Sequence, residues 1–279
     1  MCRYCVEYGK GTKWYLNPDN YRADLFQAPG HNTSFDMLSG TYKNNFEVGA
    51  AADSETNLPD YNFGGAFNIA LENITQHQGQ VVPLEDALKI IDLAYGDRFI
   101  LMHCACRRYF GHKDVYSCLF FDPVVDRVLE QRPWETDSRV ISREEAREFE
   151  MEMDRLGLVH SIWDAGVDTD GKPPIVMCHC LETDCMPTRI RAHFGIVNAQ
   201  RKGEYVAVID RKQCAEGCTK MPVCLPRCPF GAMRYSPLDQ VASVNISRCF
   251  GCGLCRSACP TSAIKLMDRI TYPALVDVW

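Results

Sequence analysis

Two stretches in the middle of the chain space their apolar residues as an amphipathic helix does. The first covers residues 83–96 and opens on a proline, which suits the first turn of a helix. Its apolar residues recur every three to four positions, so one face of this helix should be buried. The expected buried positions are Leu84, Ala87, Leu88, Ile91 and either Leu93 or Ala94.

The second helix is predicted over residues 142–157. Ser142 and Glu145 form the capping-box pattern, in which each side chain accepts a hydrogen bond from a backbone N–H at the start of the helix. Gly157 suits the left-handed residue that ends a helix. The acidic residues of this helix are expected to form a solvated face. The buried stripe is predicted to be Ala146, Phe149, Met153 and Leu156.

Each helix precedes an unbroken apolar run that ends in Cys-x-Cys. The first run reads "RFILMHCAC" and the second, after an intervening segment, reads "PPIVMCHC". Short unbroken apolar runs are typical of strands buried in parallel sheets. We therefore expect a small α/β layer in which the two strands lie side by side. Ligands in such sheets bind beyond the carboxyl ends of the strands, where both cysteine pairs fall.

These cysteines are predicted to converge on one site. Residues i and i+2 of a strand point to the same side, so neighbouring strands would bring four sulfurs together. Four thiolates suffice for a third [4Fe–4S] cluster, which we prefer, or for a tetrahedral zinc ion. Cys118 and Cys185 are substitute ligands, and the alternative is a set of buried free thiols. The predicted ligands are Cys104, Cys106, Cys178 and Cys180.

The histidines show no metal-binding pattern. His103 and His179 stand within the two Cys-x-Cys stretches and should alternate away from the sulfurs. We interpret both as strand-end residues with ordinary polar partners. The others lie at positions without metal-ligand spacing: His31, His77, His112, His160 and His193.

The strongest chemical motif lies near the end of the chain. Residues 249–260 read "CFGCGLCRSACP", the Cys-x2-Cys-x2-Cys-x3-Cys-Pro run of bacterial iron–sulfur proteins. The two-residue gaps let a tight turn bring three sulfurs around one cluster, and Gly251 and Gly253 suit that turn. Pro260 then turns the chain away.

A second run, residues 214–229, reads "CAEGCTKMPVCLPRCP". It ends in the same Cys-x3-Cys-Pro, but its earlier gaps are three and five residues, which suggests a bulged loop with Pro222 near its tip. The alternative is that this half has lost its cluster, although all four cysteines remain.

With both runs, residues 205–267 resemble a bacterial-type ferredoxin with two [4Fe–4S] clusters. "YVAVID" and "VASVNISR" would be the strands leading into the cysteine runs, and the segments after each Cys-Pro would close each half. The whole chain is more loosely similar to multi-cluster 4Fe–4S proteins of anaerobes. The resemblance implies a ligand swap between the runs. One cluster would be held by Cys214, Cys218, Cys224 and Cys259, and the other by Cys249, Cys252, Cys255 and Cys228.

Composition places the protein in a reducing compartment and argues against nucleic acid. The chain has 279 residues, 16 cysteines and a net charge of −6. No secretory signal or apolar run of membrane-spanning length is visible, so a cytoplasmic location is expected, where clustered cysteines usually bind metals. Residues 201–279 carry eleven Lys/Arg against six Asp/Glu, whereas the first 200 residues carry nineteen against thirty. This shift predicts a domain boundary near residue 200.

Together these patterns predict an α+β chain with three parts. Residues 1–82 would be an irregular N-terminal arm suited to partner docking, 83–200 a small cysteine-rich α/β domain, and 201–279 a ferredoxin-like 2[4Fe–4S] domain. "FGGAF" in the arm lacks the context of a dinucleotide fingerprint. Cys2 and Cys5 have a Cys-x2-Cys spacing and would need Cys118 and Cys185 to complete a fourth metal site.

Three functions fit these features. We expect a non-catalytic electron-transfer subunit with two or three [4Fe–4S] clusters in an anaerobic oxidoreductase complex. Its partners would be flavoprotein or metalloenzyme subunits of a hetero-oligomer, with no nucleic acid and no membrane span. A second hypothesis is a reductase or reductive activator that acts at the upstream cysteine-ligated metal. The third is a zinc-stabilised adaptor that carries a ferredoxin domain.

Overall fold

The structure is a computed structural model that describes residues 2–27, 79–104, 106–107, 116–131, 136–164, 171–218, 222–275 and 278. The predictions for residues 28–78, including the "FGGAF" stretch, lie outside the described residues. Within the described part, no helix is both long and apolar enough to cross a membrane.

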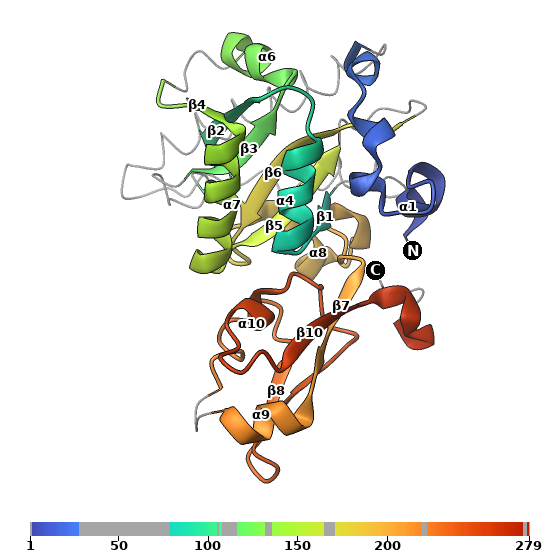
Figure 1. Cartoon of the computed structure of the whole chain (residues 1–279), viewed down its shortest axis with the longest axis vertical. Helices are drawn as coiled ribbons and strands as arrows, with labels where there is room; N and C mark the ends of the chain where they lie inside the picture. Colours follow the sequence, from blue (N-terminus) through green and yellow to red (C-terminus); the bar gives the residue numbers. More distant parts are fainter. Residues whose placement is uncertain are drawn as a thin grey trace.

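A six-stranded sheet forms the N-terminal part of the molecule (Figure 1). The two predicted strands are present as β2 and β6, but β3 lies between them and every pairing in the sheet is antiparallel. The expected side-by-side, parallel arrangement is therefore wrong. The sheet order is β1-β5-β6-β3-β2-β4, with β1 at Gly79–Val81, β2 at Arg98–His103, β3 at Tyr116–Phe121, β4 at Arg139–Ser142, β5 at Val159–Asp164 and β6 at Pro174–Cys180.

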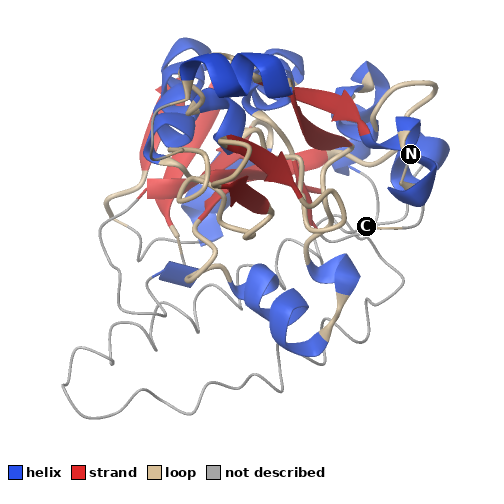
Figure 2. Ribbon diagram, turned by 90° about the horizontal axis from the view of Figure 1, so that it is seen from below, coloured by secondary structure: helices blue, strands red, loops and turns tan. Residues whose placement is uncertain are grey.

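The strands β2, β3 and β6 are buried along most of their length because helices cover both faces of this sheet (Figure 2). One face packs against α4 (Leu84–Leu93) and α7 (Arg143–Leu156), and the other packs against α6 (Val124–Gln131). Burial on both faces produces the same unbroken apolar run whether strands pair parallel or antiparallel. The run therefore indicated burial correctly and direction incorrectly. The sheet is followed by α8 (Met186–Phe194) and a 3-10 turn at Val197–Ala199.

Both predicted helices are confirmed, and α7 also contains a correction. Its capping box is formed by Ser142 and Glu145, and Gly157 ends it with φ at 90°. Leu156, however, is 50% exposed, whereas Glu150 is fully buried. The acidic residues of α7 therefore do not all form a solvated face.

The C-terminal part contains two small antiparallel pairs, β7 with β10 and β8 with β9. The strands expected around each cysteine run are thus present. α9, at the start of the first run, lies at the far end from the six-stranded sheet, whereas α10 lies on the near side (Figure 1). The elements are β7 at Tyr205–Ile209, α9 at Arg211–Gly217, β8 at Met233–Ser236, β9 at Val241–Val244, α10 at Leu254–Ser257, β10 at Ile264–Asp268, and 3-10 turns at Arg269–Thr271 and Pro273–Leu275.

Direct polar contacts join the two parts. The Arg256 guanidinium pairs with the Glu85 carboxylate on α4 at 2.5 Å. The Tyr205 hydroxyl donates to Asp86 Oδ2 at 2.8 Å. Arg227, between two cysteines of the first run, donates to the Asp154 carbonyl at the end of α7 at 2.6 Å. These contacts fix the near side of the ferredoxin-like part against α4 and α7.

Candidate iron–sulfur sites

Four cysteines from both C-terminal runs line one cavity. Cys249 and Cys252 lie in the loop after β9, and Cys255 lies on α10. Cys228 reaches the same cavity from the other run. The structure therefore brings together the four cysteines that the ferredoxin resemblance assigned to one cluster.

Backbone amides around this cavity point at sulfur. The Ala232 N–H donates to Cys228 Sγ at 3.2 Å, and those of Ala207 and Gly251 donate to Cys249 Sγ at 3.4 Å each. Such bonds stabilise a thiolate and help to set the potential of a bound cluster. Gly251 has φ at +73°, and a Cβ there would lie 2.3 Å from the Tyr205 carbonyl oxygen. Only glycine fits this close approach.

The other four cysteines of the runs line a second cavity. Cys214 on α9 and Cys218 after it come from the first run, together with Cys224. Cys259 comes from the second run and completes the group. The Ala242 N–H donates to Cys214 Sγ at 3.4 Å. The irregular gaps of the first run therefore still place its three cysteines at one cavity.

The acidity of these thiols fits a site that receives a cation. Burial raises the pKa of Cys252, raises that of Cys255 to about 12, and raises that of Cys224 to about 11. Burial also opposes ionisation of Cys259, but hydrogen bonds from Thr261 and nearby backbone N–H groups outweigh it and lower the pKa. Iron would stabilise the thiolate form of these cysteines, since metal binding replaces the proton.

A third group of cysteines gathers on the α6 face of the six-stranded sheet. Cys118 on β3 stands directly opposite Cys178 on β6. Hydrogen bonds with Cys104 and Cys178, together with burial, raise the pKa of Cys118, whereas bonds from Cys106 and Cys118 lower that of Cys104. The interposed strand β3 thus contributes a thiol of its own.

Two further thiols adjoin this group. A hydrogen bond with Cys185 raises the pKa of Cys180, and the charges of Cys178 and Cys104 add to this effect. Six thiols therefore interact here, including both predicted substitutes. We call them the upstream thiols: Cys104, Cys106, Cys118, Cys178, Cys180 and Cys185.

His179, between two upstream thiols, faces the opposite side of the sheet as predicted. Its Nε2 lies 2.9 Å from Glu150 Oε2 on α7, and its Nδ1 lies 3.1 Å from the Ser117 carbonyl oxygen. His160 on β5 shares the same carboxylate, with 2.8 Å between Nδ1 and Oε2. Burial opposes ionisation of Glu150, but the two imidazoles outweigh it and lower its pKa to about 2.

The sequence analysis missed this buried triad, although one signal was present. Glu150 follows Ala146 by four residues and precedes Met153 by three, so the helical period places it on the buried stripe. A carboxylate on a buried stripe needs a partner. The two histidines supply it.

Cys2 and Cys5 do not join Cys118 and Cys185. They lie instead beside Glu204, and the three ligand atoms are all within 4.8 Å of one another. Glu204 was not among the predicted site residues, because 199 positions separate it from Cys5 in the sequence.

An apolar cluster connects the upstream thiols to the nearer C-terminal cavity. Cys180 packs against a group that contains Val81, Val159, Leu254 and the cavity residue Cys252. Phe230 and Phe250 pack on the same cluster, with their rings stacked at 3.8 Å. Packed apolar side chains therefore lie between Cys180 of the upstream thiols and Cys252 of the nearer C-terminal cavity.

The comparisons with known proteins concern the C-terminal part. Residues 212–264 match the 4Fe-4S dicluster domain family. Over 70 residues the chain is 31% identical to an uncharacterized ferredoxin of Methanocaldococcus jannaschii, which covers 25% of this chain and 37% of that relative. The chain thus spans little more than a third of the length of this relative. No solved structure matches the chain significantly.

The C-terminal region therefore contains a 4Fe–4S dicluster domain that is similar to a ferredoxin, and the predicted resemblance is confirmed. A domain of this kind implies two [4Fe–4S] clusters and one-electron transfer through them. The mixture of helices and strands predicted for the chain is also present.

Proposed function

We propose that this protein is an electron-transfer subunit with three [4Fe–4S] clusters, part of an anaerobic, cytoplasmic redox complex. Two clusters would occupy the C-terminal cavities with the swapped ligand sets, Cys228 joining the second run and Cys259 the first. The upstream thiols would hold the third cluster. When bound, the clusters supply one-electron redox chemistry, and the protein holds them in sequence.

The apolar connection between Cys180 and Cys252 carries this proposal. Electrons tunnel efficiently only between centres held close together, and here a ligand of the upstream site and a ligand of the nearer C-terminal site share one packed cluster. Two arginines hold the two sites at this separation. Arg256 pairs with Glu85, and Arg227 donates to a carbonyl oxygen at the end of α7.

The farther C-terminal site is suited to exchange electrons with a partner protein. Val223 lines its cavity and is 48% exposed. Arg211 and Lys212 lie on α9, which also carries the cavity residue Cys214, and their exposed side chains pair with Asp239 and Glu216. An exposed apolar tip near charged side chains of both signs favours docking of a redox partner such as a flavoprotein or metalloenzyme subunit.

Iron and sulfide quantitation tests the number of clusters. Protein purified without oxygen should contain about twelve irons per chain, against about eight for a plain two-cluster domain. The Cys104→Ala/Cys178→Ala variant should fall to about eight, because two adjacent thiols of the upstream group are lost. Electron paramagnetic resonance of the reduced variant should show one interacting cluster fewer than that of the unmodified chain.

Val176→Ala is the matched control, because Val176 is buried two residues before Cys178 on the same face of β6. It creates a comparable cavity but removes no thiol, so its iron content should equal that of the unmodified chain. An iron content near eight in both the unmodified chain and the cysteine variant would contradict the third cluster. Zinc in the upstream site would instead favour the adaptor hypothesis.

A further inference from the structure

Cys2, Cys5 and Glu204 form a buried donor group that the electron-transfer function does not use. The two Sγ atoms are 3.5 Å apart, and Cys5 Sγ lies 3.1 Å from Glu204 Oε1. Each of the three residues is 3% exposed or less. Three groups that carry negative charge when ionised therefore share one enclosed space.

A fourth donor borders the same space. Gln80, on β1, is fully buried, and its Oε1 lies 3.9 Å from Cys2 Sγ. Its Nε2 donates to the Lys202 carbonyl at 3.2 Å, while the Trp14 indole donates to Oε1 at 2.6 Å. These two bonds fix the amide so that its oxygen faces Cys2 Sγ, while its Nε2 also donates to Glu204 Oε1 at 3.4 Å.

The distances fit tetrahedral zinc. Bonds of about 2.3 Å to sulfur and about 2.0 Å to oxygen imply sulfur–sulfur edges of about 3.8 Å and sulfur–oxygen edges of about 3.5 Å. The observed separations of 3.5, 3.1 and 3.9 Å fall around these values. Only small side-chain shifts would be needed to seat an ion.

The charge balance points the same way. Burying ionised thiols and a carboxylate together is costly unless a cation compensates them. The Arg201 guanidinium acts electrostatically on Cys2, Glu204 and Cys5 and offers one positive charge. Two thiolates and one carboxylate carry three negative charges, so a divalent ion together with Arg201 would neutralise the site.

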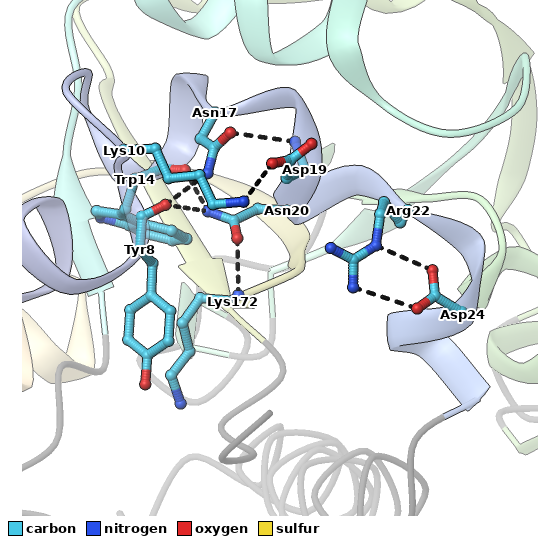
Figure 3. A network of polar contacts seen from close by, with 9 residues as sticks. All are labelled: Tyr8, Lys10, Trp14, Asn17, Asp19, Asn20, Arg22, Asp24 and Lys172. Atoms are coloured by element: carbon cyan, nitrogen blue, oxygen red, sulfur yellow. Dashed lines mark hydrogen bonds and ion pairs between the residues drawn. The ribbon is translucent and has the colours of Figure 1, made fainter. Parts of the chain in front are cut away.

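The segment that carries the cysteines is firmly held. Figure 3 shows its polar network, in which Asn17 Nδ2 donates to the Tyr8 carbonyl at 2.7 Å and Asn20 Nδ2 donates to the Trp14 carbonyl at 2.7 Å. Asn20 Oδ1 in turn accepts the Lys172 backbone N–H at 3.0 Å. The Trp14 backbone N–H donates to Cys5 Sγ at 3.4 Å, as second-layer donors do in metal–thiolate sites.

We propose that Cys2, Cys5 and Glu204, with the Gln80 carbonyl oxygen as fourth donor, bind a structural zinc ion. The ligands come from three separate places: the N-terminal segment, strand β1 of the sheet, and the residue before β7 of the ferredoxin-like part. The ion would fasten these three together. It would therefore fix the position of the dicluster domain relative to the upstream thiols.

Zinc X-ray absorption on the full chain tests this site without interference from iron. Protein reconstituted with zinc should hold about one zinc per chain, with two sulfur scatterers at about 2.3 Å and oxygen scatterers at about 2.0 Å. Four sulfur scatterers would place the zinc at a cysteine-only site instead and overturn the proposal. The zinc spectrum is independent of the iron count. The zinc site can therefore be disproved while the proposed electron-transfer function stands, and the electron-transfer function can be disproved while the zinc site stands.

Variants identify the ligands. Cys2→Ala/Cys5→Ala and, separately, Glu204→Gln should lose about nine-tenths of the bound zinc and leave the iron content unchanged. Glu7→Gln is the matched control, because Glu7 lies exposed on the same helix as Cys5 and its carboxylate pairs with Arg3. Zinc retained by the double variant would overturn the proposal. So would a Cys2–Cys5 disulfide, detected by mass after alkylation, in protein incubated with zinc under reducing conditions.

Discussion

The Cys228→Ala/Cys252→Ala double variant should lose about four irons per chain, no more than either single variant. Both cysteines line the nearer C-terminal cavity, so the second substitution removes a ligand from a cluster that is already lost. The Cys259→Ala/Cys252→Ala double variant should lose about eight irons, because Cys259 lines the farther cavity. Iron and sulfide quantitation on anaerobically prepared protein measures both results.

The comparison of these two double variants distinguishes ligand swap from ligand sets that are contiguous in sequence. If residues 214–228 held one cluster and residues 249–259 held the other, the outcome would reverse: Cys228 with Cys252 would remove both clusters, and Cys259 with Cys252 only one. Equal losses in the two double variants would contradict both assignments. Ala232→Gly serves as the control. Ala232 donates its backbone N–H to Cys228 Sγ, and this substitution keeps that donor and changes no cysteine.

Arg269→Met should lower the free energy of unfolding of the C-terminal domain by about 3 kcal/mol or more. Arg269 is fully buried, and its guanidinium donates to the carbonyl oxygens of Gly203, Tyr205 and Cys249 at 2.9, 2.9 and 2.8 Å. Methionine fills much of the space but leaves three buried acceptors without their donor. The urea midpoint of cluster bleaching, measured without oxygen, should therefore fall sharply.

Arg234→Met provides the matched comparison. Arg234 also donates to backbone carbonyl oxygens, those of Gly231 and Met233, but its side chain is exposed and water can replace it. Its substitution should change stability by about 0.5 kcal/mol or less. Similar urea midpoints for the two variants would show that the Arg269 contacts contribute little, contrary to the prediction.

The sequence predicted the C-terminal domain well because its chemistry is encoded locally. Three sulfurs spaced by two residues, with glycines between them, can reach one cluster only through tight turns. The strands before and after each run follow from their apolar residues. The capping box and Gly157 likewise specified the ends of α7 from neighbouring residues alone.

The structure brings together the upstream thiols that were named from the sequence, but through a strand order that was not predicted. That order depends on which segments pair, and unbroken apolar runs carry no information about direction. Strand β3 returns beside β2 and inserts Cys118 between the two Cys-x-Cys pairs. Cys118 therefore occupies a central position that its spacing in the sequence did not reveal.

Contacts between residues far apart in the sequence were the other feature that could not be predicted. Glu204 and Cys5 lie 199 positions apart in the sequence, and no local pattern links them. Glu150 differs, because its partners were distant but its burial could be inferred from the helical period. The N-terminal arm and its docking role stay a prediction, as does the division into three domains.

The alternation of Cys178, His179 and Cys180 along β6 makes the pairing of this strand unusually sensitive to error. A shift by one residue would turn the imidazole toward the upstream thiols and turn both sulfurs toward Glu150 on α7. In such a misfolded chain the buried Glu150 carboxylate would lose the His179 imidazole as its partner. Cys118 would also no longer stand opposite Cys178. If the upstream thiols hold the proposed third cluster, its insertion would select the correctly paired strand during maturation, and cofactor supply would influence how much of the newly made protein reaches its native fold.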